Sequence, residues 1–117
     1  MLPAVMISRR QIRELSEQIA REFNPERIIL FGSHAYGRPT DESDVDLLVV
    51  MPFRGKDFRQ AVKISCRLPA HLPVDLIVRT PETLRRRLEL GDFFLREIVE
   101  KGQVLYAAPH GGVGPES

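Results

Sequence analysis

The chain has 117 residues, enough for one domain, and its 43% hydrophobic and 28% charged residues are typical of a globular protein. No apolar stretch approaches the roughly 20 residues that span a bilayer. Seventeen Lys plus Arg against sixteen Asp plus Glu leave a net charge of +1, and one cysteine excludes an internal disulfide, so we expect a cytoplasmic protein with no membrane contact and no direct nucleic-acid binding.

The first half of the chain predicts one helix and two strands. Ser8 and Gln11 have the spacing of a capping box, and the apolar residues that follow recur at helical intervals. Two apolar runs rich in branched side chains are typical of buried strands, and the segment between them holds the turn-formers Gly37 and Pro39. The expected elements are a helix over 8–23, a strand over 27–31, a loop over 34–43 and a strand over 44–50.

The second half predicts three helices and two strands. Apolar residues at three- and four-residue steps indicate a helix, and a short apolar run after two prolines indicates a strand. Thr80 followed by Pro81 predicts a helix start, Asp92 can cap another helix, and Gly102 can end it. The expected elements are helices over 56–68, 81–90 and 93–101, and strands over 74–78 and 103–106.

Helices that alternate with strands favour a small α/β (α+β) fold. We expect a small mixed β-sheet with helices packed mainly on one face, while the other face stays partly open. Residues 1–106 would form this single domain. The last residues, 107–117, include three glycines and two prolines and would form a flexible tail.

Gly32 and Ser33 directly follow the first expected strand. Glycine lets the backbone approach a ligand closely, and a serine hydroxyl beside the amides of a turn or helix start suits a phosphate. Taken alone, such a pair is more often a strand-ending turn in which the serine caps a helix.

Asp44 and Asp46 are two residues apart in an apparent strand, so their side chains leave the same face. Carboxylates this close repel each other unless a cation lies between them, and Mg²⁺ prefers oxygen ligands of this kind. The alternative is a turn-forming start of the strand, with Asp46 exposed at an edge.

Asp75 interrupts the otherwise apolar run 74–78. If this strand is the neighbour of the preceding one, Asp75 can face the same cation as Asp44 and Asp46. Three carboxylates on two strands are what a two-metal phosphoryl or nucleotidyl transfer site requires. On its own, Asp75 would more often be an exposed edge residue.

The segment GSHAYGRPTDESDVDLLVV resembles the signature of the nucleotidyltransferase superfamily shared with DNA polymerase beta, and specifically its minimal nucleotidyltransferase branch. The resemblance extends from residue 28 to the REIVEKGQVLY segment near the end. It implies a nucleotidyltransferase-like fold, ATP as substrate and two Mg²⁺ ions. The residues that it implicates in triphosphate binding are Gly32 and Ser33, and those that it implicates in catalysis and metal binding are Asp44, Asp46 and Asp75.

One position departs from the family pattern. Relatives often carry arginine where this chain has Tyr36, and Arg38 follows two residues later. Arg38 is therefore our candidate for the residue that helps to bind the nucleotide phosphates.

The resemblance also implies a partner, because minimal nucleotidyltransferases are commonly paired with a small helical HEPN protein, a toxin ribonuclease. The implied activity is that of an antitoxin that transfers AMP from ATP to a tyrosine of this HEPN-type partner. A catalytically weak binding module that neutralises its partner by complex formation is the alternative. A second copy of the chain is another candidate partner, since a chain of this size leaves no spare domain to recognise the acceptor.

Other residues admit simpler interpretations. His34 could contact phosphate or be an exposed loop histidine, and the run 85–87 of three arginines is expected on a solvated helix face. Cys66 is expected to be a core or near-core thiol. Phe93 and Phe94 are expected to serve packing, with an interface as the alternative.

Overall fold

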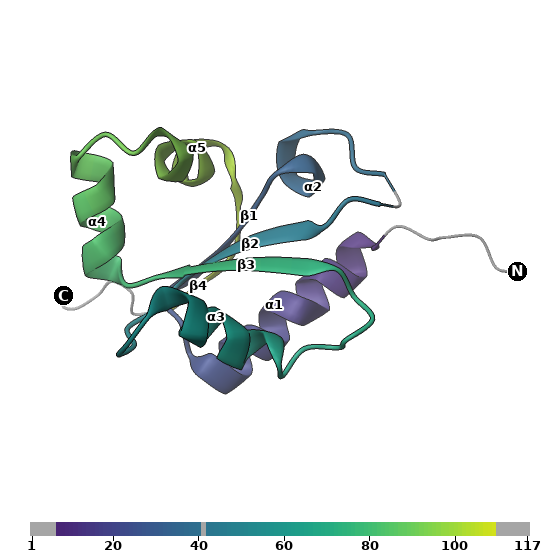
Figure 1. The fold of residues 1–117 in the computed structure, drawn as a ribbon. Coiled ribbons are helices and arrows are strands. Elements are labelled where there is room, and N and C mark those ends of the chain that lie inside the picture. The colour runs from purple at the N-terminus through teal and green to yellow at the C-terminus, as the bar shows by residue number, and fades with distance from the viewer. Residues whose placement is uncertain (1–6, 41, 110–117) are drawn as a thin grey trace, which may run out of the picture.

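The computed structural model describes residues 7–40 and 42–109 (Figure 1). Its elements in chain order are α1 (Arg9–Phe23), β1 (Arg27–Phe31), α2 (Ser33–Tyr36), β2 (Val45–Val50), α3 (Asp57–Ser65), β3 (Val74–Arg79), α4 (Pro81–Glu89), α5 (Phe93–Lys101) and β4 (Gln103–Ala107). Of the expected tail, 110–117 lies outside the described residues. Among the helices described, none has the length and apolar character needed to cross a membrane.

Three helices begin at the expected capping side chains. The Ser8 hydroxyl accepts a hydrogen bond from the Gln11 amide at 3.1 Å, and the Gln11 side chain accepts one from the Ser8 amide at 2.9 Å. Thr80 caps α4, whose first residue is Pro81, and Asp92 caps α5. Because each cap satisfies an amide that the helix leaves unpaired, the three predicted helix starts are confirmed.

The four strands form one mixed sheet in the order β3-β2-β1-β4. β1 is antiparallel to both β2 and β4, whereas β2 and β3 are parallel and are connected through α3. The register places Phe31 opposite Asp46, and Asp46 opposite Asp75. These three side chains therefore project from the same face of the sheet, on three adjacent strands.

Helices α1 and α3 cover one face of the sheet. Ile12 and Ile19 of α1 and Ile64 of α3 are buried against strand side chains, and Figure 1 shows the two helices together below the sheet. The strand residues of this cluster are Ile28, Leu30, Val45, Leu47, Val49 and Val78.

Helices α4 and α5 cover part of the opposite face. Leu84, Leu95 and Ile98 are buried against strand side chains, and Figure 1 shows these helices above one end of the sheet. The strand residues of this cluster are Ile29, Phe31, Leu48 and Val50. The fold class is confirmed, but helices lie on both faces rather than mainly on one. The reason is visible in β2, whose apolar residues are buried on both of its sides, as in a strand covered by two layers.

Two local expectations differ from the structure. The expected loop over 34–43 begins with a single helical turn, α2, and the expected helix over 56–68 ends at Ser65. Cys66 therefore follows the last turn of α3 and is exposed, so the expectation of a core thiol was wrong. The predicted arginine-rich helix face is solvated as expected, because the residues of 85–87 are exposed.

Candidate active site

Gly32 forms the turn between β1 and α2. Its φ angle of +76° lies in a region that side-chain-bearing residues rarely adopt. Its carbonyl accepts hydrogen bonds from the amides of Ala35 at 3.0 Å and Tyr36 at 3.1 Å, which closes the single turn of α2. Among the described residues the amides of Ser33 and His34 have no backbone partner, so they remain available to a ligand.

The Gly32 turn lies directly beside the Asp46 carboxylate. A Cβ atom on Gly32 would overlap Oδ2 of Asp46 and would lie 3.2 Å from its Cγ. The absence of a side chain at residue 32 therefore lets the turn backbone and the carboxylate share one corner of the sheet. The spacing of Gly32 and Asp46 in the sequence does not by itself predict this contact.

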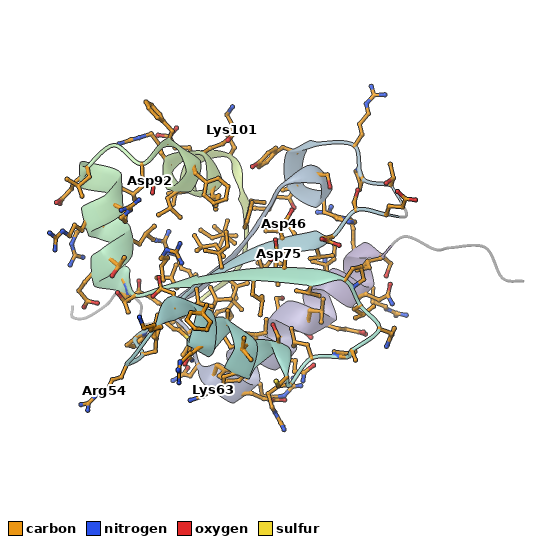
Figure 2. All side chains as sticks on the ribbon, in the orientation of Figure 1. Asp46, Arg54, Lys63, Asp75, Asp92 and Lys101 are labelled. Carbon is orange, nitrogen blue, oxygen red and sulfur yellow. The ribbon has the colours of Figure 1, made fainter. Side chains whose placement is uncertain are left out.

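Asp46 and Asp75 form the centre of the site. They are register partners on β2 and β3, and Figure 2 shows them side by side on the face that also carries α2, α4 and α5. Strands in a sheet are about 4.8 Å apart, so the two carboxylates are close neighbours. Asp75 is exposed and Asp46 is half-buried.

The environment of Asp46 disfavours its negative charge. Burial raises the pKa of the Asp46 carboxyl above its ordinary value of 3.8, and the charges of Asp75 and then Asp44 raise it further. Asp44 precedes β2 and is exposed. The structure thus pairs Asp46 with Asp75 on one face of the sheet and leaves Asp44 outside β2, where its charge affects the pKa of Asp46 less than the charge of Asp75 does.

No ion pair between described residues neutralises this charge. The ion pairs between described residues involve other carboxylates, and none includes Asp44, Asp46 or Asp75. A half-buried carboxylate with two like-charged neighbours and oxygen donors throughout fits a hard divalent cation such as Mg²⁺. Within 7–40 and 42–109, however, no three His, Cys, Asp or Glu side chains form a ready-made metal cluster.

His34 belongs to the site, although the sequence favoured an exposed loop position at least as strongly. It lies on α2, is only 9% exposed, and places Nε2 3.4 Å from the Ser43 carbonyl oxygen. Its charge acts on the pKa of Asp46 in the opposite direction to the two neighbouring aspartates. The signal that could have identified His34 is its position immediately after the Gly-Ser turn, in the first residues of a helix.

Arg38 and Tyr36 are less closely involved. Arg38 is exposed in the segment between α2 and β2 and makes no ion pair with any residue that the structure describes. Tyr36 ends α2 with 45% of its surface exposed. Both side chains can therefore reorient without disturbing the core.

An aromatic wall borders the Gly32 turn. The Phe94 ring meets the ring of Phe31 edge to face, with centroids 5.8 Å apart, and Phe31 immediately precedes Gly32. Phe94 is 52% exposed and Phe93 is 85% exposed. Phe94 thus serves packing, as expected, while Phe93 is left largely in solvent.

Comparisons with known proteins identify the family of the chain. The family model "Nucleotidyltransferase domain" matches residues 12–105, a range that contains Gly32, Ser33 and the three aspartates. The chain belongs to this family and is a nucleotidyltransferase.

Individual proteins are also similar to the chain. A protein of Methanocaldococcus jannaschii named "putative protein adenylyltransferase" is 34% identical over 82 residues, which cover 68% of this chain and 77% of that protein. The crystal structure of a "putative nucleotidyltransferase" from Sulfolobus solfataricus superposes with a TM-score of 0.59 and 25% identity, over 87% of this chain and 82% of that one. The expected nucleotidyltransferase-like fold is confirmed.

Proposed function

We propose that this nucleotidyltransferase transfers AMP from ATP to a hydroxyl group of another protein. The observation that carries the proposal is the pairing of Asp46 and Asp75 beside the Gly32 turn. Two neighbouring carboxylates favour a bound cation, and the backbone amides of the turn suit a phosphate. The name of the M. jannaschii relative supports a protein as the acceptor.

Asp44, Asp46 and Asp75 would hold two Mg²⁺ ions. Bound there, the ions would supply the positive charge that stabilises a phosphorus centre during nucleotidyl transfer. Ser33 and the amides at the start of α2 would bind the β- and γ-phosphates and so orient the pyrophosphate that leaves. Asp75, the exposed member of the pair, would accept the proton of the attacking hydroxyl.

We further propose a HEPN-type ribonuclease toxin as the partner, with a tyrosine as the acceptor, so that the chain acts as an antitoxin in the cytoplasm. The support is the resemblance of the GSHAYG and DVDLLVV segments to minimal nucleotidyltransferases.

Tyr36 favours a second candidate function. It stands at the end of α2 where the family often has arginine, so phosphate binding would lack one cation. In this case the chain would neutralise its partner by forming a complex, and AMP transfer would be weak or absent.

Labelled ATP distinguishes the two functions. The purified chain and the protein encoded by the neighbouring gene, which we expect to be of HEPN type, are mixed with Mg²⁺ and ATP labelled in the α-phosphate. We expect label on the partner, and about 10²-fold less with Asp46→Asn, because several kcal/mol of transition-state stabilisation is lost. The control is Asp92→Asn, the same change at the junction of α4 and α5, where asparagine also caps a helix (Figure 2). Equal labelling of the partner by the wild type and by Asp46→Asn would reject transfer at this site. Neutralisation of the partner without any label would also reject the transfer activity.

A further inference from the structure

β3 is an edge strand with an unpaired outer side. Of the strands that the structure describes it pairs only with β2, and it is the strand nearest the viewer in Figure 1. In the part of the chain that the structure describes, no backbone hydrogen bond reaches this outer side. Open edges of this kind can accept an additional strand from another chain.

The direction of each β3 backbone group follows from the ends of the ladder. The Val45 amide donates to the Pro73 carbonyl at 2.8 Å, and the Met51 amide donates to the Arg79 carbonyl at 3.1 Å. Successive residues of a strand point their amides and carbonyls to opposite sides. The groups of Asp75 and Ile77 therefore point to β2, and those of Val74, Leu76 and Val78 point outward.

Among residues 7–40 and 42–109, a side chain blocks this edge at its far end. The Arg79 guanidinium donates to the outward carbonyl of Val78 at 2.8 Å and pairs with Asp57 at 3.1 Å. This arrangement blunts the edge at the end of β3 that is distant from the candidate site. The outward groups of Leu76 and Val74, on either side of Asp75, remain open.

A groove of 540 Å³ lies between α3 and the later part of β3, from Leu76 onward, and the Arg79–Asp57 ion pair is part of its lining. Phe58 and Ala61 of α3 line it together with Leu76 and Ile77 of β3, and Phe58 is 62% exposed. An apolar groove beside free backbone groups suits an extended peptide whose alternate side chains need pockets.

The charge along the groove is positive. Lys56 lines the groove, and the Arg59 guanidinium carbon lies 6.0 Å from the centre of the Phe58 ring. Neither cation forms an ion pair with a described residue, and the acidic Asp57 is already paired with Arg79. The groove is therefore complementary to an acidic segment.

The site itself indicates the side from which an acceptor approaches. Across the sheet, the Gly32 turn follows β1, Asp46 lies on β2, Asp75 lies on β3, and the open edge comes next. With the pyrophosphate held at the Gly32 turn, in-line attack on the α-phosphorus requires the hydroxyl to enter from the opposite side. That side is the outer edge of β3.

We infer that the outer edge of β3 binds an extended, acidic segment of the acceptor protein as an added strand; this inference rests on the proposed transfer of AMP to a protein. A residue opposite Asp75 in such a strand lies about 4.8 Å away, with its side chain on the same face of the sheet. Its hydroxyl oxygen forms a bond to the α-phosphorus of ATP, the bond to the pyrophosphate oxygen breaks, and the proton passes to the Asp75 carboxylate.

A synthetic peptide tests the inference separately from the activity. The probe is a nine-residue peptide that alternates Glu and Val around a central Tyr, and the controls replace Glu by Lys or Tyr by Phe. Binding is measured by amide hydrogen exchange of the full chain in NMR spectra, and transfer by label from ATP. We expect the acidic peptides to slow exchange of the outward Leu76 amide at least tenfold, with the Ile77 amide, already bonded to β2, unchanged.

Surface variants locate the binding site. Lys56→Glu with Arg59→Glu should weaken peptide binding about tenfold through two reversed charges. Lys63→Glu is the matched control, since Lys63 extends from α3 away from β3 (Figure 2). Phe58→Ser should also weaken binding. Val62→Ser should not, because Val62 is similarly exposed on α3 but lies outside the groove.

The outcomes separate the two proposals. Protection of Leu76 together with labelling of the Tyr peptide supports both, and protection without labelling supports the edge site but rejects transfer. Labelling that occurs without protection, or that is unaffected by Phe58→Ser and by the double charge reversal, overturns the edge site and leaves the transfer activity intact. If neither protection nor labelling is observed, both proposals are rejected.

Discussion

Gly32 and Asp46 occupy adjoining space so completely that a methyl group on the glycine would overlap the aspartate carboxylate. The contact joins the turn after β1 to the first half of β2, so the two motifs recognised in the sequence are parts of one corner. Two features require glycine at this position: the φ angle of +76° and the lack of space for a Cβ atom.

Gly32→Ala tests this contact. We expect Gly55→Ala to cost about 1 kcal/mol of unfolding free energy and Gly32→Ala roughly twice as much. The reason is that Gly55 also has a positive φ, +89°, but an added Cβ there meets nothing within 4 Å. Urea unfolding measures both variants. We also expect AMP transfer to fall about tenfold or more only in Gly32→Ala, because the carboxylate is displaced. Equal losses in both variants would mean that the backbone angle alone matters.

The raised pKa of Asp46 makes the metal-free protein sensitive to pH. A group whose pKa is higher in the folded state stabilises the fold at pH values below its unfolded pKa, 3.8, and this contribution is lost as the pH rises through the folded value. Without Mg²⁺, we expect Asp46→Asn to be more stable than the wild type at pH 7 and to lose this advantage near pH 4. Thermal unfolding in EDTA across this range provides the measurement. A constant difference between the two proteins would show that Asp46 carries no unfavourable charge.

Asp44 should contribute to ligand binding but little to stability, because it is exposed and precedes β2. We expect Asp44→Ala to abolish the heat of binding of Mg²⁺ with a non-hydrolysable ATP analogue in isothermal titration, and to leave the melting temperature unchanged. Glu42→Ala, which removes an exposed acid two residues earlier, is the control. Wild-type affinity in Asp44→Ala would remove this residue from the metal site.

Asp92 should show the opposite pH dependence to Asp46. Its hydrogen bond from the Leu95 amide, with further help from Arg87, holds the pKa of the Asp92 carboxyl below its ordinary value of 3.8. Its stabilising contribution is therefore present above pH 3.8 and is lost as the pH falls through the lower folded value. We expect Asp92→Asn to lose less stability than the wild type between pH 5 and pH 3 in urea unfolding. Parallel curves for the two proteins would contradict the ionic cap.

Tyr36→Arg tests whether the departure from the family pattern limits catalysis. Tyr36 is 45% exposed, so we expect the substitution to fold normally. A guanidinium that reaches a phosphate should lower the KM for ATP about tenfold. Tyr36→Leu, which removes the ring and adds no charge, should not lower it. An unchanged KM in Tyr36→Arg would show that the arginine of relatives has no counterpart function here.

Much of the fold could be predicted because local chemistry determines it. The Ser8 capping box, the Thr80-Pro81 start and the Asp92 cap each act within a few residues, and each appears in the structure where it was expected. The shared face of Asp46 and Asp75 follows from strand periodicity once β2 and β3 are neighbours. The alternation of side chains along each strand could predict which face they share. The residue pairing between β2 and β3 could be known only from the assembled sheet.

The remaining differences depend on long-range packing. Helices on both faces became necessary because β2 is apolar on both sides, a pattern that a short continuous apolar run also shows in other settings. The burial of His34 depends on a single helical turn that packs against β2, and the exposure of Cys66 depends on where α3 ends. The position of His34 directly after the Gly-Ser turn suggests that it lies near the site, but no local signal specifies its burial or the residue at which α3 ends.

β2 has a strand on each edge and helices over both faces, and Asp46 belongs to it whereas Asp44 does not. The interior strand fixes the backbone of Asp46 when the chain folds, so a bound nucleotide would have to order only the side chain of this residue. Asp44 is exposed and lies outside β2, so a bound nucleotide would have to order its backbone as well. Asp46 would then be in position before the ligand binds, whereas Asp44 would reach its final position only during binding.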